Sequence, residues 1–168
     1  MDTPIRIAVL TVSDSASQGL RKDASGLALV EVLNTIPCCE VIWTGIVSDD
    51  EDSIAAELKH QCDEAGAEII FTTGGTGLSH RDRTPEATLK VADRVVPGIA
   101  EALRAASMRA TPMGMISRGA AALRGQSLIV NLPGSPKGAV ENLRAFLPVM
   151  QHAAEILRGD NRRHETSA

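Results

Sequence analysis

The chain has 168 residues, of which 43% are hydrophobic and 23% charged, a balance typical of one folded domain and not of a disordered chain. Its net charge of −4 and its scarce aromatic residues argue against a surface for binding nucleic acid. Three cysteines without disulfide or metal-site spacing, no basic and apolar leader, and no apolar run of membrane-spanning length predict a cytoplasmic protein that contacts no membrane.

The first part of the chain predicts a strand, a helix and a second strand. The apolar, β-branched run Ile5–Val12 predicts a strand covered on both faces. After a polar turn, residues 26–34 predict a helix that either Asp23 or Ser25 would cap. Residues 40–46 predict the second strand.

The remainder continues this alternation. The acidic run 49–52 precedes an amphipathic helix, and residues 68–72 predict a third strand that leads directly into a glycine-rich turn. The later elements, in chain order, are helices at 85–92 and 98–109, an irregular or hairpin-like segment at 111–124, a strand at 127–131 and a long helix at 139–157.

Alternating strands and helices predict an α/β fold of three layers, with a mostly parallel sheet and helices on both faces. In such folds ligands bind beyond the carboxyl ends of the strands. Polar or glycine-rich turns follow all four predicted strands, so we expect these turns at one edge of the sheet. We take residues 4–160 as a single domain and residues 161–168 as a polar tail.

The strongest chemical signal is TTGGTG at Thr72–Gly77. Glycines let the backbone approach a ligand closely and adopt positive φ, so that consecutive N–H groups converge on a phosphate. Thr73 and Thr76 add hydroxyl donors. A plain tight turn would also explain the glycines, and the Walker pattern is absent. The neighbouring sequence favours a ligand.

Two groups of carboxylates accompany this turn. Asp82 lies between Arg81 and Arg83, where it would hold Mg²⁺ against phosphate oxygens or merely pair with the arginines. One residue of the acidic run 49–52 would face Asp82 across a pocket, although such runs are also typical of solvated helix N-termini. Two carboxylates that share Mg²⁺ suit phosphoryl or nucleotidyl transfer. We expect Thr84 to be a plain N-cap.

Two further segments offer hydrogen-bond donors. The turn at 132–136 presents Gly134 and Ser135, although turn chemistry alone also explains it. Ser117 and Arg118 form another donor pair, for which a surface hairpin is an equally good explanation.

Together these segments resemble the MogA/MoaB family, which includes bacterial molybdopterin adenylyltransferases and the gephyrin G domain. The resemblance covers nearly the whole chain. The matching stretches are TVSDS at 11–15, DASG at 23–26, TTGGTG at 72–77, RDRTPEAT at 81–88, PGIAEALR at 97–104 and SRGAAALRGQSLIVNLPGSPKG at 117–138.

The resemblance implies the MogA-like fold and transfer of AMP from Mg²⁺-bound ATP to the terminal phosphate of molybdopterin, with release of pyrophosphate. It also implies a homotrimer and hand-over of the product to a molybdate-insertion enzyme. The family's catalytic, metal-holding aspartates fall on Asp49 and Asp82. The expected substrate-binding residues are Ser13, Asp14, Thr73, Gly74, Gly75, Thr76, Gly77, Ser117, Pro133, Gly134 and Ser135.

Alternatives remain at both the residue and the function level. The chain has Val-Ser-Asp-Asp at 47–50 where the family often has Val-Pro-Asp-Glu, so Asp50 is an alternative to Asp49. A MoaB-like protein that binds molybdopterin without adenylylating it is the alternative function, and retention of Asp49 and Asp82 argues against it. Further alternatives are a molybdate-insertion enzyme, which normally carries extra domains, and an unrelated nucleotide-binding α/β protein.

Overall fold

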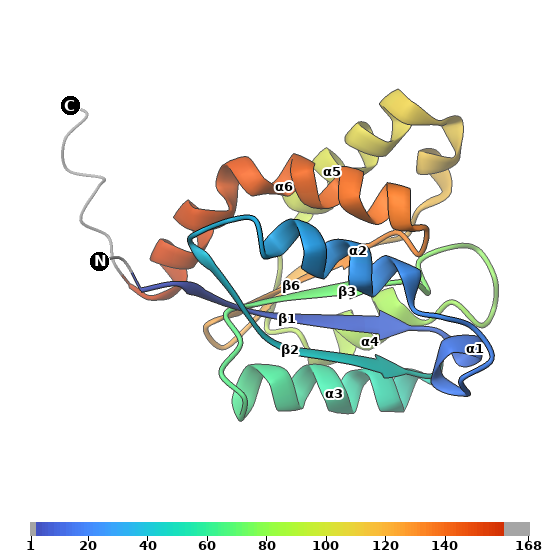
Figure 1. The fold of residues 1–168 in the computed structure, drawn as a ribbon, viewed down its shortest axis with the longest axis horizontal. Helices are drawn as coiled ribbons and strands as arrows, with labels where there is room; N and C mark the ends of the chain where they lie inside the picture. The colour runs from blue at the N-terminus through green and yellow to red at the C-terminus, as the bar shows by residue number, and fades with distance from the viewer. Residues whose placement is uncertain (1–2, 160–168) are drawn as a thin grey trace.

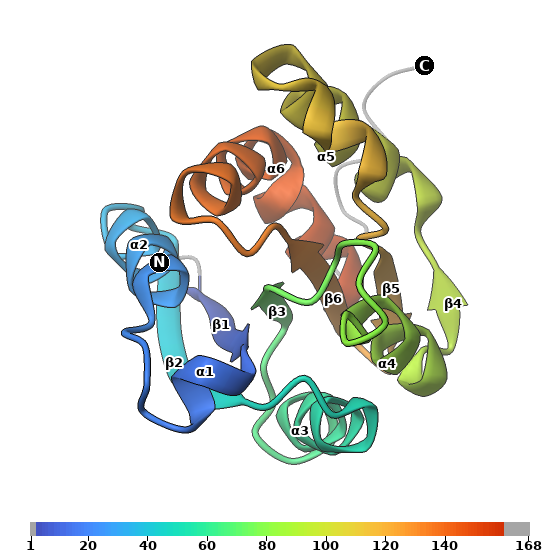
Figure 2. The ribbon, with the colours of Figure 1, turned by 90° about the vertical axis from the view of Figure 1, so that its right-hand side faces the viewer.

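A six-stranded sheet lies between two layers of helices in the computed structural model, which describes residues 3–159 (Figures 1 and 2). The strands are β1 (Ile5–Val12), β2 (Cys39–Val47), β3 (Ile69–Thr73), β4 (Arg94–Val95), β5 (Ala121–Arg124) and β6 (Ser127–Leu132). The helices are α1 (Asp14–Ser17), α2 (Ala24–Leu33), α3 (Glu51–Asp63), α4 (Thr84–Val91), α5 (Pro97–Ala110), the 3-10 helix η1 (Pro112–Ile116) and α6 (Pro136–Leu157). The predicted three-layer α/β fold is confirmed, while the tail at 161–168 lies outside the described residues.

The strand order β2-β1-β3-β6-β5-β4 explains why the polar turns meet. β1 pairs in parallel with β2 and β3, and β3 pairs in parallel with β6, so these four strands end at the same edge, on the right of Figure 1. β5 and β4 extend the sheet in the antiparallel sense. The expected gathering of four strand-end turns at one edge is therefore confirmed.

Side chains alternate between the two faces of each parallel strand and build two cores. On β1, Ile7 and Val9 pack beneath α2, α5 and α6, while Ala8 and Leu10 face α3 and α4. Figure 2 shows these helices on opposite sides of the sheet. Burial on both faces accounts for the almost uninterrupted apolar sequence of β1. The two cores fix the strand ends, and with them the turns, in place.

Most elements begin or end within three residues of their predicted bounds. Two short ones were not predicted, because neither follows from the apolar periodicity of the sequence. The turn after β1 contains the four-residue α1, which begins where the Ser13 hydroxyl accepts a hydrogen bond from the Ala16 N–H. The two-residue β4 exists through pairing with β5. The hairpin-like segment at 111–124 contains η1 and β5, and β5 forms a hairpin with β6.

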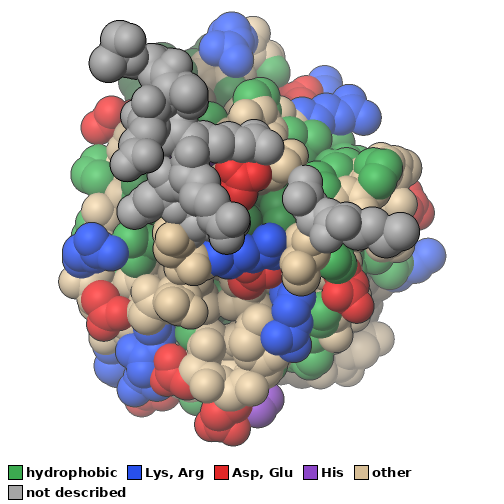
Figure 3. All heavy atoms as spheres, turned by 90° about the vertical axis from the view of Figure 1, so that its left-hand side faces the viewer, with side chains coloured by type: hydrophobic (Ala, Val, Ile, Leu, Met, Phe, Trp, Pro, Cys, Tyr) green, Lys and Arg blue, Asp and Glu red, His purple; other side chains and the backbone are tan. Residues whose placement is uncertain are grey.

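The face at the amino ends of the parallel strands carries interspersed acidic and basic side chains (Figure 3). There Arg158, at the end of α6, donates hydrogen bonds to the carbonyls of Thr3 and Pro4 at 3.0 Å and pairs with Glu68. This contact joins the two ends of the described chain. Among the described helices, none is both long and apolar enough to cross a membrane.

Candidate functional site

A polar pocket of about 450 Å³ lies beyond the carboxyl ends of β1, β2, β3 and β6. It receives residues from every one of the four strand-end turns. The predicted site residues that line it are Ser13, Asp49, Thr73, Gly74, Gly75, Asp82, Gly134 and Ser135. Sequence segments more than 100 residues apart thus form one cavity, as expected for a parallel sheet.

The glycine turn forms one wall of this pocket and requires glycine. Gly74 has φ +100° and Gly75 has φ +66°, both in the region that favours glycine. A Cβ on Gly74 would collide with the carbonyl oxygen of Val12, at the end of β1. The Thr73 hydroxyl donates a 2.7 Å hydrogen bond to the Pro133 carbonyl, so this side chain joins two turns of the pocket.

Thr84 holds the same turn from beneath, and its expected role as an N-cap is wrong. It is the first residue of α4, and the capping position belongs to Arg83, which has no side-chain cap bond. The fully buried Thr84 hydroxyl instead donates to the Gly74 carbonyl at 2.9 Å. No local sequence pattern marks this contact, because it depends on α4 packing under the turn.

Replacing Thr84 by Val should destabilise the protein by about 1–3 kcal/mol, because the buried Gly74 carbonyl would lose its donor while the side-chain shape is kept. Urea denaturation measures this change. Thr35→Val is the matched control, since the Thr35 hydroxyl makes a similar 2.7 Å bond to a carbonyl at an exposed position. Water can replace that bond, so we expect a change within about 0.5 kcal/mol. Equal destabilisation of the two variants would contradict the role given to Thr84.

Asp49 and Asp82 line the polar pocket, and each has one oxygen engaged. Asp49 Oδ2 accepts from the Asp14 N–H at 2.9 Å, and Asp82 Oδ2 accepts from the Ser79 N–H at 3.0 Å. Within residues 3–159, the other oxygen of each carboxylate has no hydrogen bond. Both carboxylates therefore retain an acceptor for a ligand or a cation.

Electrostatics at Asp49 favour a bound cation. Burial raises the pKa of the Asp49 carboxyl above its ordinary value, and the charges of Asp14 and Asp82 add to this, although a backbone hydrogen bond from Asp14 opposes it. A raised pKa means that the ionised form is under-stabilised in this protein. A cation between Asp49 and Asp82 would supply the missing stabilisation.

The structure separates Asp49 from the alternative, Asp50. Asp50 caps α3: its carboxylate accepts from the Ser53 N–H at 2.9 Å and from the Ser53 hydroxyl at 2.7 Å. These bonds lower the pKa of Asp50. Asp50 is not part of the pocket wall, whereas Asp49 is.

Asp14 was expected to bind substrate, but its carboxylate has other partners and does not line the pocket. Asp14 Oδ1 accepts from the Asp49 N–H at 2.9 Å, while Oδ2 pairs with Arg81. The hydrogen bond from Asp49 and then the Arg81 guanidinium lower the pKa of Asp14. Asp14 thus holds the turn that carries Asp49.

Sequence reasoning missed several residues of the pocket wall. Arg21 and Lys22, in the loop between α1 and α2, are exposed cations there. Asp23 caps α2 by accepting from the Gly26 N–H at 2.8 Å, and it accepts a second bond from Thr11 at 2.9 Å. Asp23 belongs to the DASG segment, which is recognisable in the sequence. Arg21 and Lys22 reach the pocket wall only because the loop folds back, and no sequence pattern marks them.

Two helix N-termini also face the polar pocket. α2 begins after Asp23, and Ala24 and Ser25 line the cavity. α6 begins after its cap Ser135, and Pro136 lines the cavity. Helix N-termini carry partial positive charge, so both favour an anion in this pocket.

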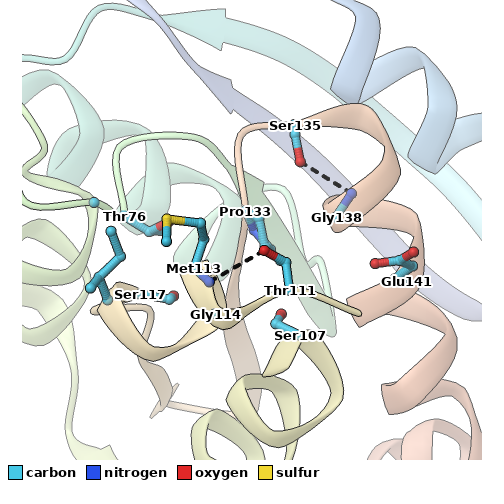
Figure 4. Close-up of a pocket in the computed structure, with 12 residues that line it drawn as sticks. Thr76, Ser107, Thr111, Met113, Gly114, Ser117, Pro133, Ser135, Gly138 and Glu141 are labelled. Carbon is cyan, nitrogen blue, oxygen red and sulfur yellow. Dashed lines mark hydrogen bonds between the residues drawn. The ribbon is translucent and has the colours of Figure 1, made fainter. Parts of the chain in front are cut away.

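A second, smaller pocket of about 210 Å³ adjoins the first (Figure 4). Ser135 lines both cavities. The predicted residues Thr76, Gly77, Ser117 and Pro133 line this pocket, together with Ser107, Thr111, Met113, Gly114, Ile116, Gly138 and Glu141. In Figure 4, Met113 and Thr76 lie on one side of this pocket, and Glu141 of α6 lies on the other. Its apolar side chains suit a flat heterocycle better than a phosphate.

The described residues contain no group of three or more His, Cys, Asp or Glu side chains that could form a metal cage. Two carboxylates that face one pocket nevertheless fit Mg²⁺, which is typically held by one or two carboxylates together with substrate phosphates.

Comparisons with known proteins point in one direction. A family model described as "Probable molybdopterin binding domain" matches residues 8–152. Molybdopterin adenylyltransferase of Helicobacter pylori (strain ATCC 700392 / 26695) is 41% identical over 157 residues, covering 93% of this chain and 89% of that protein. The enzyme of the same name from Escherichia coli (strain K12) is 39% identical over 140 residues, covering 83% and 72%. The crystal structure of the molybdopterin biosynthesis enzyme MoaB from Thermus thermophilus has a TM-score of 0.87 and 49% identity, covering 92% of this chain and 97% of that one.

Proposed function

The chain belongs to the molybdopterin-binding domain family, and from this membership we propose that it is a molybdopterin adenylyltransferase of molybdenum cofactor biosynthesis that uses Mg²⁺-bound ATP. It transfers AMP to the terminal phosphate of molybdopterin. The observation that carries the proposal is the polar pocket in which Asp49, Asp82 and the glycine turn face two helix N-termini.

The reaction needs positioning more than acid–base chemistry. A phosphate oxygen of molybdopterin attacks the α-phosphorus of ATP, the bond to the β-phosphate oxygen breaks, and pyrophosphate leaves. The nucleophile is already an anion, so no general base is required. The enzyme must bring two polyanions together and offset their repulsion.

The residues of the pocket divide this task. Asp49 and Asp82 would hold Mg²⁺, which neutralises phosphate charge when bound. The Gly74 N–H donates to the Leu132 carbonyl, so the remaining N–H groups of the glycine turn, together with the N-termini of α2 and α6, would stabilise the phosphates. Arg21 and Lys22 add positive charge at the rim. The adjoining apolar pocket suits one of the two heterocycles, with the reacting phosphates meeting near Ser135.

A single assay separates this function from molybdopterin binding alone. Purified protein is incubated with Mg²⁺, molybdopterin and ATP labelled at the α-phosphate. The proposal requires label on molybdopterin and one pyrophosphate for each adenylylated molecule. Bound molybdopterin without label or pyrophosphate would indicate a MoaB-like binding protein.

We also propose that the protein is a homotrimer, and an apolar surface supports self-association. Met113 and Met115 of η1 are 63% and 66% exposed, and Ile116 at the end of the same helix is 46% exposed. Exposed apolar side chains gathered on one surface mark interaction sites. Hand-over to a molybdate-insertion enzyme stays a prediction from the family resemblance, and a cytoplasmic location stays a prediction from the sequence.

Met115→Glu is expected to convert the trimer to monomers, because a charge placed in an apolar interface loses its hydration without a partner. Light scattering after size-exclusion chromatography measures the mass. Leu20→Glu, at a 77% exposed position in the loop after α1, is the control and should leave the trimer intact. A wild-type monomer would refute the trimer, and a trimeric Met115→Glu variant would refute this interface.

A further inference from the structure

Arg118 ties the loop between the glycine turn and α4 to the body of the protein. Its Nε donates to the Gly77 carbonyl at 2.7 Å, and its NH2 donates to the Asp82 carbonyl at 2.6 Å. Its NH1 pairs with Glu86 of α4, and its backbone N–H donates to the Thr76 carbonyl at 2.8 Å. One guanidinium therefore holds both ends of loop 77–82.

For Arg118, this arrangement differs from both expectations stated for the Ser117–Arg118 pair. Ser117 lines the apolar pocket, but Arg118 does not line either the polar or the apolar pocket. Its side chain is only 34% exposed, and its donors are engaged by the loop and by Glu86. Arg118 is thus neither a surface hairpin residue nor a ligand donor.

The loop has few bonds of its own to fix its position. Within it, the Asp82 N–H donates to the Ser79 carbonyl at 2.9 Å, and the Ser79 N–H donates to Asp82 Oδ2. These bonds shape the turn but do not orient it against the sheet. Residues 78–81 are all exposed. Arg81 forms an ion pair with Asp14, but a solvent-exposed ion pair of this kind contributes little to stability.

Arg118 is suited to orient the loop because its donors form a rigid planar fork. Two carbonyls and a carboxylate accept from one guanidinium, a geometry that lysine cannot reproduce. Burial alone would raise the pKa of Glu86, but the hydrogen bond from Arg118, a backbone hydrogen bond and the charges of Arg118 and Arg83 together outweigh burial, and the pKa is lowered. The Glu86 carboxylate therefore stays ionised at neutral pH and available to Arg118.

We infer that Arg118 is the positioning residue for Asp82, fixing both ends of loop 77–82 so that the Asp82 carboxylate faces Asp49 before metal and nucleotide arrive. The inference rests on the proposed function, in which Asp82 holds the Mg²⁺ of ATP. Without Arg118, the loop occupies the binding arrangement for only part of the time. The apparent metal affinity falls in proportion to the competent fraction, so a loop that is competent a tenth of the time gives roughly tenfold weaker binding.

The test compares Arg118→Gln with Arg124→Gln. Arg124 is a matched control, because it also pairs with a carboxylate, that of Asp63, and donates to a carbonyl, that of Val91 at 2.9 Å. It lies outside both pockets. Calorimetry measures Mn²⁺ affinity in the presence of an ATP analogue with a methylene group between the α- and β-phosphates. Hydrogen exchange measures the opening of residues 77–83 without metal.

We expect Arg118→Gln to bind Mn²⁺ roughly tenfold more weakly and to exchange faster in the loop, with Arg124→Gln like wild type in both. Arg118→Lys should recover only part of the affinity. Wild-type Mn²⁺ affinity in Arg118→Gln would overturn the inference and leave the function intact, even if the variant melts at a lower temperature. If the wild-type protein bound no Mn²⁺ together with the nucleotide analogue, both the inference about Arg118 and the proposed function would be overturned.

Discussion

Asp82→Asn is expected to lower turnover by on the order of 100- to 1,000-fold while the fold is retained. The asparagine oxygen can still accept from the Ser79 N–H, so the turn keeps its shape. The substitution removes the negative charge, and with it a ligand for Mg²⁺. Pyrophosphate release at saturating substrate measures turnover, and circular dichroism and the unfolding midpoint check the fold.

Asp50→Asn is the control for this experiment and also tests the alternative metal ligand. Asp50 caps α3 outside the pocket, and asparagine is an equally good cap. Turnover should therefore stay near the wild-type value. Wild-type turnover in Asp82→Asn would remove Asp82 from the mechanism. A large loss of turnover in Asp50→Asn with none in Asp49→Asn would mean that Asp50, and not Asp49, is the metal ligand.

Gly74→Ala is expected to destabilise the protein by at least about 2–3 kcal/mol and to abolish nucleotide binding. The φ of +100° is strained for alanine, and the new methyl group would collide with the Val12 carbonyl. Relief requires the turn to move away from β1, which displaces Gly74 and Gly75 from the wall of the polar pocket. Urea denaturation measures the first effect, and calorimetry with the non-hydrolysable ATP analogue measures the second.

Gly125→Ala separates backbone strain from the collision. Gly125 also has positive φ, +55°, but a methyl group there meets no atom within 4 Å. This variant should be destabilised by only about 1–2 kcal/mol, the cost of the left-handed conformation for alanine, and should bind nucleotide normally. If Gly74→Ala were no less stable than Gly125→Ala and bound nucleotide equally well, the glycine turn would not form the phosphate site.

The features that the sequence predicted well are those with local causes. Ile5–Val12 is recognisable as a strand because burial on both faces selects β-branched residues at nearly every position. The meeting of four polar turns follows from parallel pairing, which places the carboxyl ends of β1, β2, β3 and β6 together. The candidate pocket could therefore be located before any coordinates were known.

The features that sequence reasoning missed depend on contacts between distant segments. Thr84 precedes a proline and therefore has the sequence context of a cap, but packing of α4 buries its hydroxyl against the Gly74 carbonyl. Arg118 is separated from Gly77 and Asp82 by 41 and 36 positions, and no local pattern marks such a bond. The positions of Asp49 in the pocket wall and of Asp50 at the cap of α3 likewise could not be read from the sequence.

The most direct test of the account is a crystal of the protein with Mn²⁺ and the non-hydrolysable ATP analogue. Anomalous scattering locates the manganese independently of the surrounding density. We predict a single strong peak in the polar pocket, within bonding distance of a carboxylate oxygen of both Asp49 and Asp82, with the phosphates against the turn at Gly74–Gly77. Manganese bound away from these carboxylates, or nucleotide bound outside this pocket, would contradict the account.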